Sequence, residues 1–317
     1  NTPQKDLKWN CETWYCVEQF FKMATEEEKE KFFDLVKKGN IGLSANYLNF
    51  NDLADCKYLK EKIHTMQEIC GEQGIQIKTA MIADINGISM GQRDAMIENG
   101  VEFLYTNIHT HHGMYQNQKP YFWENEDGKR LLVWNGEHYN LGNALGIVLN
   151  KNVNFMTENY FGKKNGDVAG LLENLHTNLS ASIKEYEENG YPYDFYITSV
   201  SGVFSDNAPI NPAIADTVEL FNEKYGEEVT MHMVTLQELY ERIRDKVQDA
   251  PVYRGAINDW WGNGVGSTPY AVKHYKEAVR LNRICDRLEE KTGVHNEELI
   301  QAYGDNSLLY AEHTWGH

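Results

Sequence analysis

Residues 75–84 read IQIKTAMIAD, and this stretch decides how the surrounding chain is interpreted. Its first nine residues, Ile75–Ala83, predict a β-strand, so Asp84 places a carboxylate directly after a strand end. The following Ile85-Asn86-Gly87 predicts a turn. An amphipathic helix is predicted before the strand, at Asp55–Glu72, and a short helix after it, at Gln92–Asn99. The stretch therefore belongs to a unit in which strands and helices alternate.

The same alternation continues along most of the chain. Capping boxes at Thr25/Glu28 and Thr235/Glu238 mark two further helix starts. Strands are predicted at Ile41–Phe50, Phe103–Ile108, Leu131–Trp134, Phe195–Val200 and Val229–Val234, and helices at Glu26–Lys38, Val168–Glu188 and Pro212–Tyr225. This order predicts an α/β fold with a mostly parallel sheet, in which functional residues lie after the carboxyl ends of strands. From about Tyr270 a long helix is predicted with no strand after it, so a helical segment is expected to begin near Ser267.

Composition excludes some classes of function. The 317 residues carry a formal net charge of −17, which argues against binding held by nucleic-acid phosphates. No uncharged apolar run approaches the roughly 20 residues that a membrane-spanning helix needs, so a soluble protein is expected. The five cysteines include no C-x-x-C pair and predict no disulfide framework. Neither terminus carries a signal from which a compartment can be read.

Two aspartates follow predicted strands. Asp84 could be a turn residue, and Asp206, after the Phe195–Val200 strand, could cap the helix that begins after Pro209. As a pair at one sheet edge they suit glycoside hydrolysis, which needs two carboxylates about 5–5.5 Å apart for retention of configuration.

Histidines and tryptophans supply the other candidates. His109, His111 and His112 follow a predicted strand and are either metal ligands or a hydrogen-bonded loop cluster. His138 lies in another polar run after a strand, and His313 follows a short apolar run near the end of the chain. Asp259-Trp260-Trp261 precedes glycines, and two adjacent indoles in a glycine-rich loop favour a platform on which a sugar ring stacks.

The order of these motifs resembles glycoside hydrolase family 38, the α-mannosidases and their bacterial relatives. The resemblance rests on Asp84-Ile85-Asn86-Gly87, Asp206-Asn207-Ala208-Pro209-Ile210, Asp259-Trp260-Trp261 and Glu312-His313-Thr314-Trp315-Gly316, with Asn51-Asp52 resembling the family's early acidic loop. It covers almost the whole chain, and it depends more on the order of the motifs than on any one of them.

The resemblance implies a seven-stranded β/α barrel, residues 1–266, followed by the start of a helical bundle, residues 267–317. It also implies one Zn²⁺ ion in the intact protein. Asp84 would be the nucleophile and a zinc ligand, Asp206 the general acid/base, and His313 a second zinc ligand. The remaining candidates, expected to contact the sugar, are Asp52, His109, His138, Asp259, Trp260 and Trp261.

The family's other two zinc ligands lie in a His-x-Asp motif on the first strand, and this chain contains no His-x-Asp sequence. The resemblance therefore places that strand upstream of Asn1, so the chain is expected to lack the first strand, half of the metal site and the later domains.

Three functions remain open at this point. The first is a retaining, zinc-dependent α-mannosidase acting on a mannoside substrate. The second is a non-catalytic carbohydrate-binding or degenerate homologue, which the missing His-x-Asp motif favours. The third is a metal-dependent polysaccharide deacetylase, in which the His109–His112 cluster would bind the metal.

Overall fold

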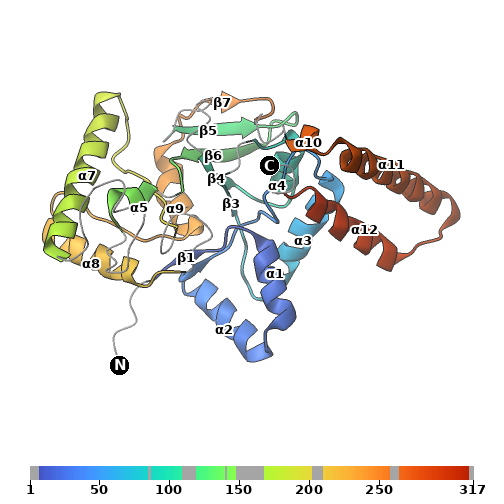
Figure 1. Cartoon of the computed structure of the whole chain (residues 1–317), viewed down its shortest axis with the longest axis horizontal. Helices are drawn as coiled ribbons and strands as arrows, with labels where there is room; N and C mark the ends of the chain where they lie inside the picture. Colours follow the sequence, from blue (N-terminus) through green and yellow to red (C-terminus); the bar gives the residue numbers. More distant parts are fainter. Residues whose placement is uncertain are drawn as a thin grey trace.

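The protein is an α/β structure with one central sheet and helices on both of its faces (Figure 1). The computed structural model describes residues 7–84, 87–108, 119–139, 141–147, 168–201, 210–257 and 264–313. The strands are β1 (Trp9–Asn10), β2 (Ile41–Gly42), β3 (Thr79–Asp84), β4 (Phe103–Ile108), β5 (Lys119–Glu124), β6 (Arg130–Gly136) and β7 (Val252–Tyr253).

Helices follow or precede most of the strands. They are α1 (Trp14–Met23), α2 (Glu26–Lys37), α3 (Cys56–Glu72), α4 (Met90–Glu98), α5 (Leu141–Leu145), α7 (Val168–Glu188), α8 (Ala213–Tyr225), α9 (Leu236–Ile243) with the 3₁₀ turn η1 (Arg244–Lys246), α10 (Gly264–Ser267), α11 (Pro269–Thr292) and α12 (Glu297–Tyr310). Within the described residues, no helix is long and apolar enough to cross a lipid bilayer.

The five-stranded sheet has the order β3-β4-β6-β5-β7, in which β3, β4 and β6 are parallel and β5 is antiparallel to β6. A second, two-stranded sheet pairs β1 with β2 in parallel. The chain just after β2 joins the two sheets, since the Ala45 amide donates to Thr79 O at 2.8 Å and the Met81 amide donates to Ser44 Oγ at 2.9 Å. In the described part of the chain, strand pairing forms these two sheets and does not close into a barrel.

The two faces of the large sheet bury different cores, because successive side chains of a strand point to opposite sides. Ile82, Leu104 and Val133 belong to the cluster that includes the buried faces of α3 and α4. Phe103, Tyr105 and Trp134 face the other way, toward α9, where the Phe103 and Tyr240 rings stack with centroids 5.4 Å apart. The sheet is thus the middle layer of the fold.

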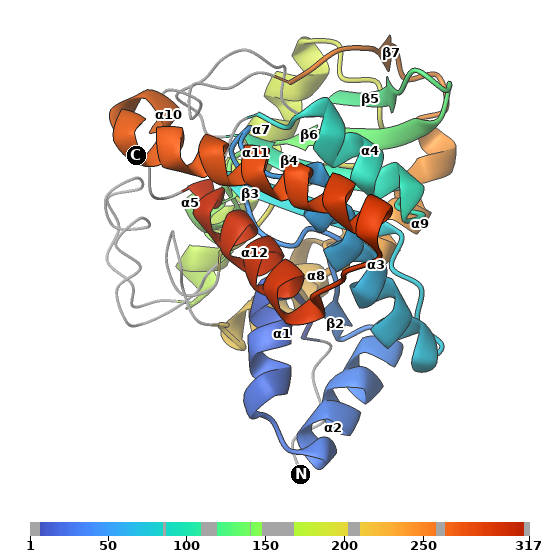
Figure 2. The same ribbon diagram turned by 90° about the vertical axis from the view of Figure 1, so that its right-hand side faces the viewer.

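Two groups of helices extend the molecule on opposite sides of the sheet. Figure 1 shows α5, α7 and α8 together on one side, where Leu175 and Phe221 are fully buried in a core of their own. On the other side α12 packs on α3 (Figure 2), and a Cβ at Gly304 would lie only 2.4 Å from Tyr58 Cδ1. That close approach requires glycine.

One side chain connects the start of the chain to a segment more than 200 residues later. Asn10 Nδ2 donates to Val234 O at 3.3 Å, and Asn10 Oδ1 accepts from the Leu236 amide at 2.8 Å. Gly42 leaves room for this amide, because a Cβ there would lie 2.0 Å from Asn10 Oδ1. Asn10 therefore holds β1 against the chain that enters α9.

Several predicted elements are confirmed and several are corrected. Phe103–Ile108 and Val168–Glu188 have the predicted bounds, and both capping boxes form. Strand β3 begins at Thr79, not Ile75, because the Gln67 side chain holds both backbone groups of Ile77. The predicted Ile41–Phe50 strand is limited to β2.

Two predicted strands, Phe195–Val200 and Val229–Val234, are wrong, because the structure forms no strand in either segment. Side-chain amides take part of their backbone hydrogen bonding: Asn222 pairs with both the N–H and the C=O of Met231, at 2.8 Å each. Directly after Phe195–Val200, Asn143 Oδ1 accepts from the Ser201 amide at 3.0 Å. These local bonds replace part of a ladder to a neighbouring strand.

The structure also contains elements that the sequence did not reveal, among them β1, α1 and β5. Among them β1 matters most, because it precedes β2 and pairs with it in parallel. A strand before the Ile41 strand was expected only outside the chain, and the structure has one within it.

We expect Asn10→Ala to lower the free energy of unfolding by about 2 kcal/mol, because it leaves the Leu236 amide and the Val234 carbonyl without their partner. Chemical denaturation measures this change. The matched control is Asn306→Ala at an exposed position of α12, where the Asn306 side chain donates to Ala302 O of the same helix. If the two variants lost equal stability, Asn10 would not connect the two ends of the chain.

Candidate functional site

The carboxyl ends of β3, β4 and β6 lie side by side at one edge of the sheet. Asp84 is in register with Ile108, and Asn107 is in register with Gly136. The chain continues from Gly136 to Glu137, so a second carboxylate follows a strand at this edge. The parallel register thus brings together the strand ends at which the sequence predicted functional residues.

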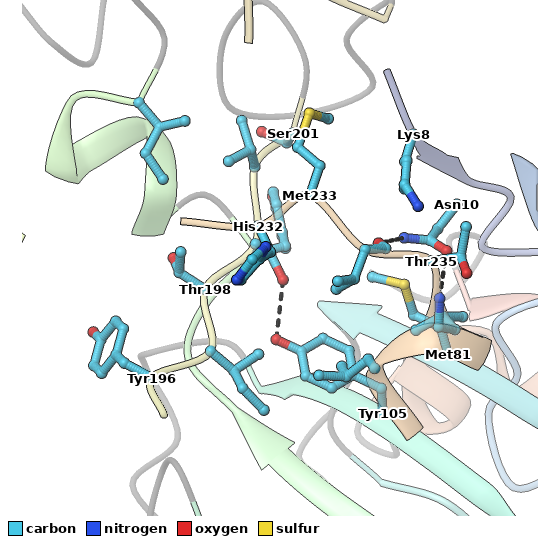
Figure 3. Close-up of a pocket in the computed structure, with 18 of the residues that line it drawn as sticks. Lys8, Asn10, Met81, Tyr105, Tyr196, Thr198, Ser201, His232, Met233 and Thr235 are labelled. Atoms are coloured by element: carbon cyan, nitrogen blue, oxygen red, sulfur yellow. Dashed lines mark hydrogen bonds between the residues drawn. The ribbon is translucent and has the colours of Figure 1, made fainter. Parts of the chain in front are cut away.

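A cavity of about 1640 Å³ opens beside this edge. Ala83, the residue before Asp84, lines it, together with Glu12 after β1, Asn49 after β2, and His313 after α12. Figure 3 shows further lining residues, among them Tyr105 and Met81 from the sheet and Thr198 and Met233 from outside it. Segments far apart in the sequence therefore meet around one cavity.

The side chain of Glu12 links two of the segments that line the cavity. Its Oε1 atom accepts from the Ala83 amide at 2.9 Å and from Asn49 Nδ2 at 2.7 Å. Asn49 in turn accepts from the His313 amide through its backbone oxygen at 3.0 Å. One carboxylate oxygen thereby links the end of β3 to the segment that carries His313.

His313 is well placed but already has a partner. Its side chain is 17% exposed, and its Nδ1 lies 2.5 Å from Glu312 Oε1. An isolated bridge between Phe50 and Glu312 holds this segment against the chain after β2. The structure thus brings His313 to the same cavity as Ala83, the residue before Asp84.

Deeper in the cavity, a polar cluster is built around Ser199. Its Oγ lies 3.0 Å from the Tyr105 hydroxyl and accepts from Asn107 Nδ2 at 3.1 Å. Burial raises the pKa of Tyr105 above its usual range, with a smaller contribution from the charge of Glu137, so the hydroxyl stays protonated. A Cβ at Gly136 would lie 2.6 Å from the Tyr105 hydroxyl, so glycine is required beside this cluster.

These polar residues were not predicted from the sequence, although β4 contains a signal for them. Tyr105 and Asn107 are two residues apart, so both belong to the face of β4 opposite the one that carries Leu104. Asn107 is fully buried. Such a buried polar residue near a strand end marks the face that turns toward a cavity. Glu12 carried no comparable signal, because β1 is only two residues long.

The other predicted site residues are distributed as follows. Asp52 is exposed, and partial burial of its carboxyl raises its pKa. The half-buried His138 ring lies on the neighbouring Tyr139 ring, with centroids 4.1 Å apart. The backbone of Asp84 belongs to β3, while its side chain lies outside the described residues, as do Asp206, His109, His111, His112, Asp259, Trp260 and Trp261.

Zinc, which the family resemblance implies, does not fit the donor atoms of the first strand. Both ends of the Asn10 amide are hydrogen-bonded to backbone, and Glu12 Oε1 accepts two hydrogen bonds. Cys11 lies between these two residues in the sequence. Burial raises the pKa of its thiol to about 12, which disfavours the thiolate that binds metal. Among the residues that the structure describes, no three His, Cys, Asp or Glu side chains form a group that could hold a metal ion.

Comparisons with known proteins give a fold but no sequence family. No protein-family model matches the chain, and no curated protein matches it. An α-mannosidase structure from Enterococcus faecalis V583 matches with a TM-score of 0.58 and 13% identity, covering 81% of this chain and 26% of that one. A protein in the glycosyl hydrolase family 38, also from Enterococcus faecalis, matches with a TM-score of 0.62 and 11% identity, covering 99% of this chain and 32% of that one.

The chain therefore spans about a third or less of the length of these two proteins. At such low identity the likeness concerns the fold alone. The chain is structurally similar to part of two glycoside hydrolases.

Proposed function

We propose that this chain is part of a retaining glycoside hydrolase of the α-mannosidase kind, which acts on a mannoside through a covalent glycosyl-enzyme. One observation carries the proposal: β3 ends in Asp84, and the preceding residue, Ala83, lines the large cavity at the edge where parallel strands end. Ligands of α/β proteins bind at such edges. The structural likeness to two glycoside hydrolases supports the same assignment.

We also propose that the fold is an open form of the seven-stranded β/α barrel, with Phe195–Val200 and Val229–Val234 in the two remaining strand positions. Two contacts support this arrangement. The Phe195 ring lies 5.4 Å from the Trp134 ring of β6, and the Asn10 amide of β1 bonds to Val234. These segments would join β6 to β1, and Asp206 would then follow a strand position as Asp84 does.

In the proposed reaction two carboxylates divide the work. Asp84 attacks the anomeric carbon and forms the glycosyl-enzyme, while Asp206 donates a proton to the leaving oxygen. Asp206 then removes a proton from the water that releases the sugar. Because the first-strand donors do not fit zinc, the proposed steps use only the two carboxylates and water, and we propose that this chain alone does not retain a metal ion.

Asp84→Ala should lower the kcat of the intact protein on aryl α-mannosides by roughly 10⁴-fold or more, because the covalent route is lost. Added azide should restore turnover and give a glycosyl azide of inverted configuration, since the small anion fits the space left by the carboxylate. Steady-state kinetics and product NMR measure both effects. Asp127→Asn, in the exposed β5–β6 turn, is the control. Full activity of the Asp84 variant would remove Asp84 from the reaction.

Asp206→Ala should slow alkyl mannosides far more than dinitrophenyl mannosides, because a good leaving group needs little protonation. The loss should differ by about 10²-fold or more between the two substrates, within the usual range for general acid catalysis. Comparing kcat/KM on both substrates measures the difference. Equal losses on the two substrates would reject Asp206 as the proton donor.

The second candidate is a carbohydrate-binding homologue without catalysis, and the absence of the His-x-Asp motif favours it. Binding and turnover measurements distinguish the two functions. If the second candidate is correct, the intact protein would bind mannosides measurably by calorimetry and release no sugar from any of them during prolonged incubation.

A further inference from the structure

The end of β3 needs a hydrogen-bond acceptor that the neighbouring backbone does not supply. Along β3 the amides alternate in direction, and those of Met81 and Ala83 point away from β4, toward the chain after β2. The Met81 amide finds Ser44 Oγ there. Beyond Ser44 the neighbouring chain turns toward α1, since Asn46 O accepts from the Trp14 amide at 2.7 Å.

Glu12 supplies the missing acceptor. Its Oε1 atom takes the Ala83 amide at 2.9 Å, at the position where the next residue of an adjacent strand would otherwise bond. Such a carboxylate-to-amide bond is charge-assisted and therefore stronger than a neutral one. This bond fixes the backbone directly before Asp84. Strand β1 ends at Asn10, so it is the side chain of Glu12, and not strand pairing by β1, that reaches this position.

The same oxygen also fixes Asn49, which lines the cavity as well. Asn49 Nδ2 donates to it at 2.7 Å, while Asn49 Oδ1 accepts from Asn46 Nδ2 at 2.8 Å. Both ends of the Asn49 amide are thus engaged, and its backbone oxygen accepts from the His313 amide. Moving Glu12 would therefore disturb both the end of β3 and the segment that carries His313.

We propose that Glu12 is the positioning residue of this site: its carboxylate clamps the end of β3 to the His313 segment. The clamp rests on the proposed function, for which it would hold Asp84 in line with the substrate. It assigns the first strand a hydrogen-bonding role in place of a metal-ligating one. Glu12 acts through Ala83 and Asn49 and does not itself react.

The test compares Glu12→Gln, which keeps an acceptor oxygen, with Glu12→Ala, which removes it, and uses Glu30→Ala on the exposed face of α2 as control. Hydrogen exchange at the Ala83 amide should accelerate about tenfold in Glu12→Ala, the equivalent of one lost hydrogen bond. Glu12→Gln should stay near the wild-type rate. This readout needs no activity, so it tests the clamp even if the proposed function is wrong.

Kinetics of the intact protein give the second readout. Glu12→Ala should lower kcat by about ten- to a hundredfold with little change in KM, as expected when a reacting group loses its alignment. Glu12→Gln should recover most of the loss. Unchanged exchange at Ala83 in Glu12→Ala would overturn the clamp. So would stoichiometric zinc in the wild-type protein that both Glu12 variants lose equally, because Glu12 would then be a metal ligand.

Discussion

The parallel register of β3, β4 and β6 is the constraint on which the rest of the site depends. Asp84 pairs with Ile108 and Asn107 pairs with Gly136, so β3, β4 and β6 finish at one edge of the sheet. The cavity lies beside this edge, and segments from distant parts of the sequence line it.

Polar side chains, more than strand ladders, hold those segments in place. Asn10 connects β1 to the chain before α9, Glu12 holds the end of β3, and Asn222 pairs with Met231. Such bonds are directional and leave the segments short of regular strand geometry. A site assembled in this way depends on single side chains, so point substitutions test its organisation directly.

The sequence correctly predicted the helices that are specified by neighbouring residues in the chain. Amphipathic periodicity and capping boxes placed α2, α3, α7 and α9 within a few residues, because those signals act within one or two turns. The sequence also placed Asp84 at the carboxyl end of a strand, where it is the last residue of β3, and His313 near the end of a helical segment. Ala83 and His313 line one cavity, while the predicted roles of Asp84 and His313 stay predictions.

What the sequence did not predict depends on contacts between distant residues. Strand β1 is two residues long and is a strand only because β2 lies beside it, so no periodicity marks it. The roles of Glu12 and Asn49 arise from the turn that the chain takes after Ser44, which no local pattern encodes. Phe195–Val200 shows the opposite error, in which an apolar run predicted a strand in a segment that pairs with no strand among the described residues.

The claim at the centre of this account is that Asp84 becomes covalently attached to the sugar. Incubating the intact protein with a fluorinated mannosyl inactivator, followed by peptide mass spectrometry, tests it most directly, because the fluorine slows release of the intermediate. The account predicts one added sugar per chain, on the peptide that contains Asp84. A sugar attached instead to Glu12 or Glu137, the other carboxylates that follow strands at this edge, would contradict it.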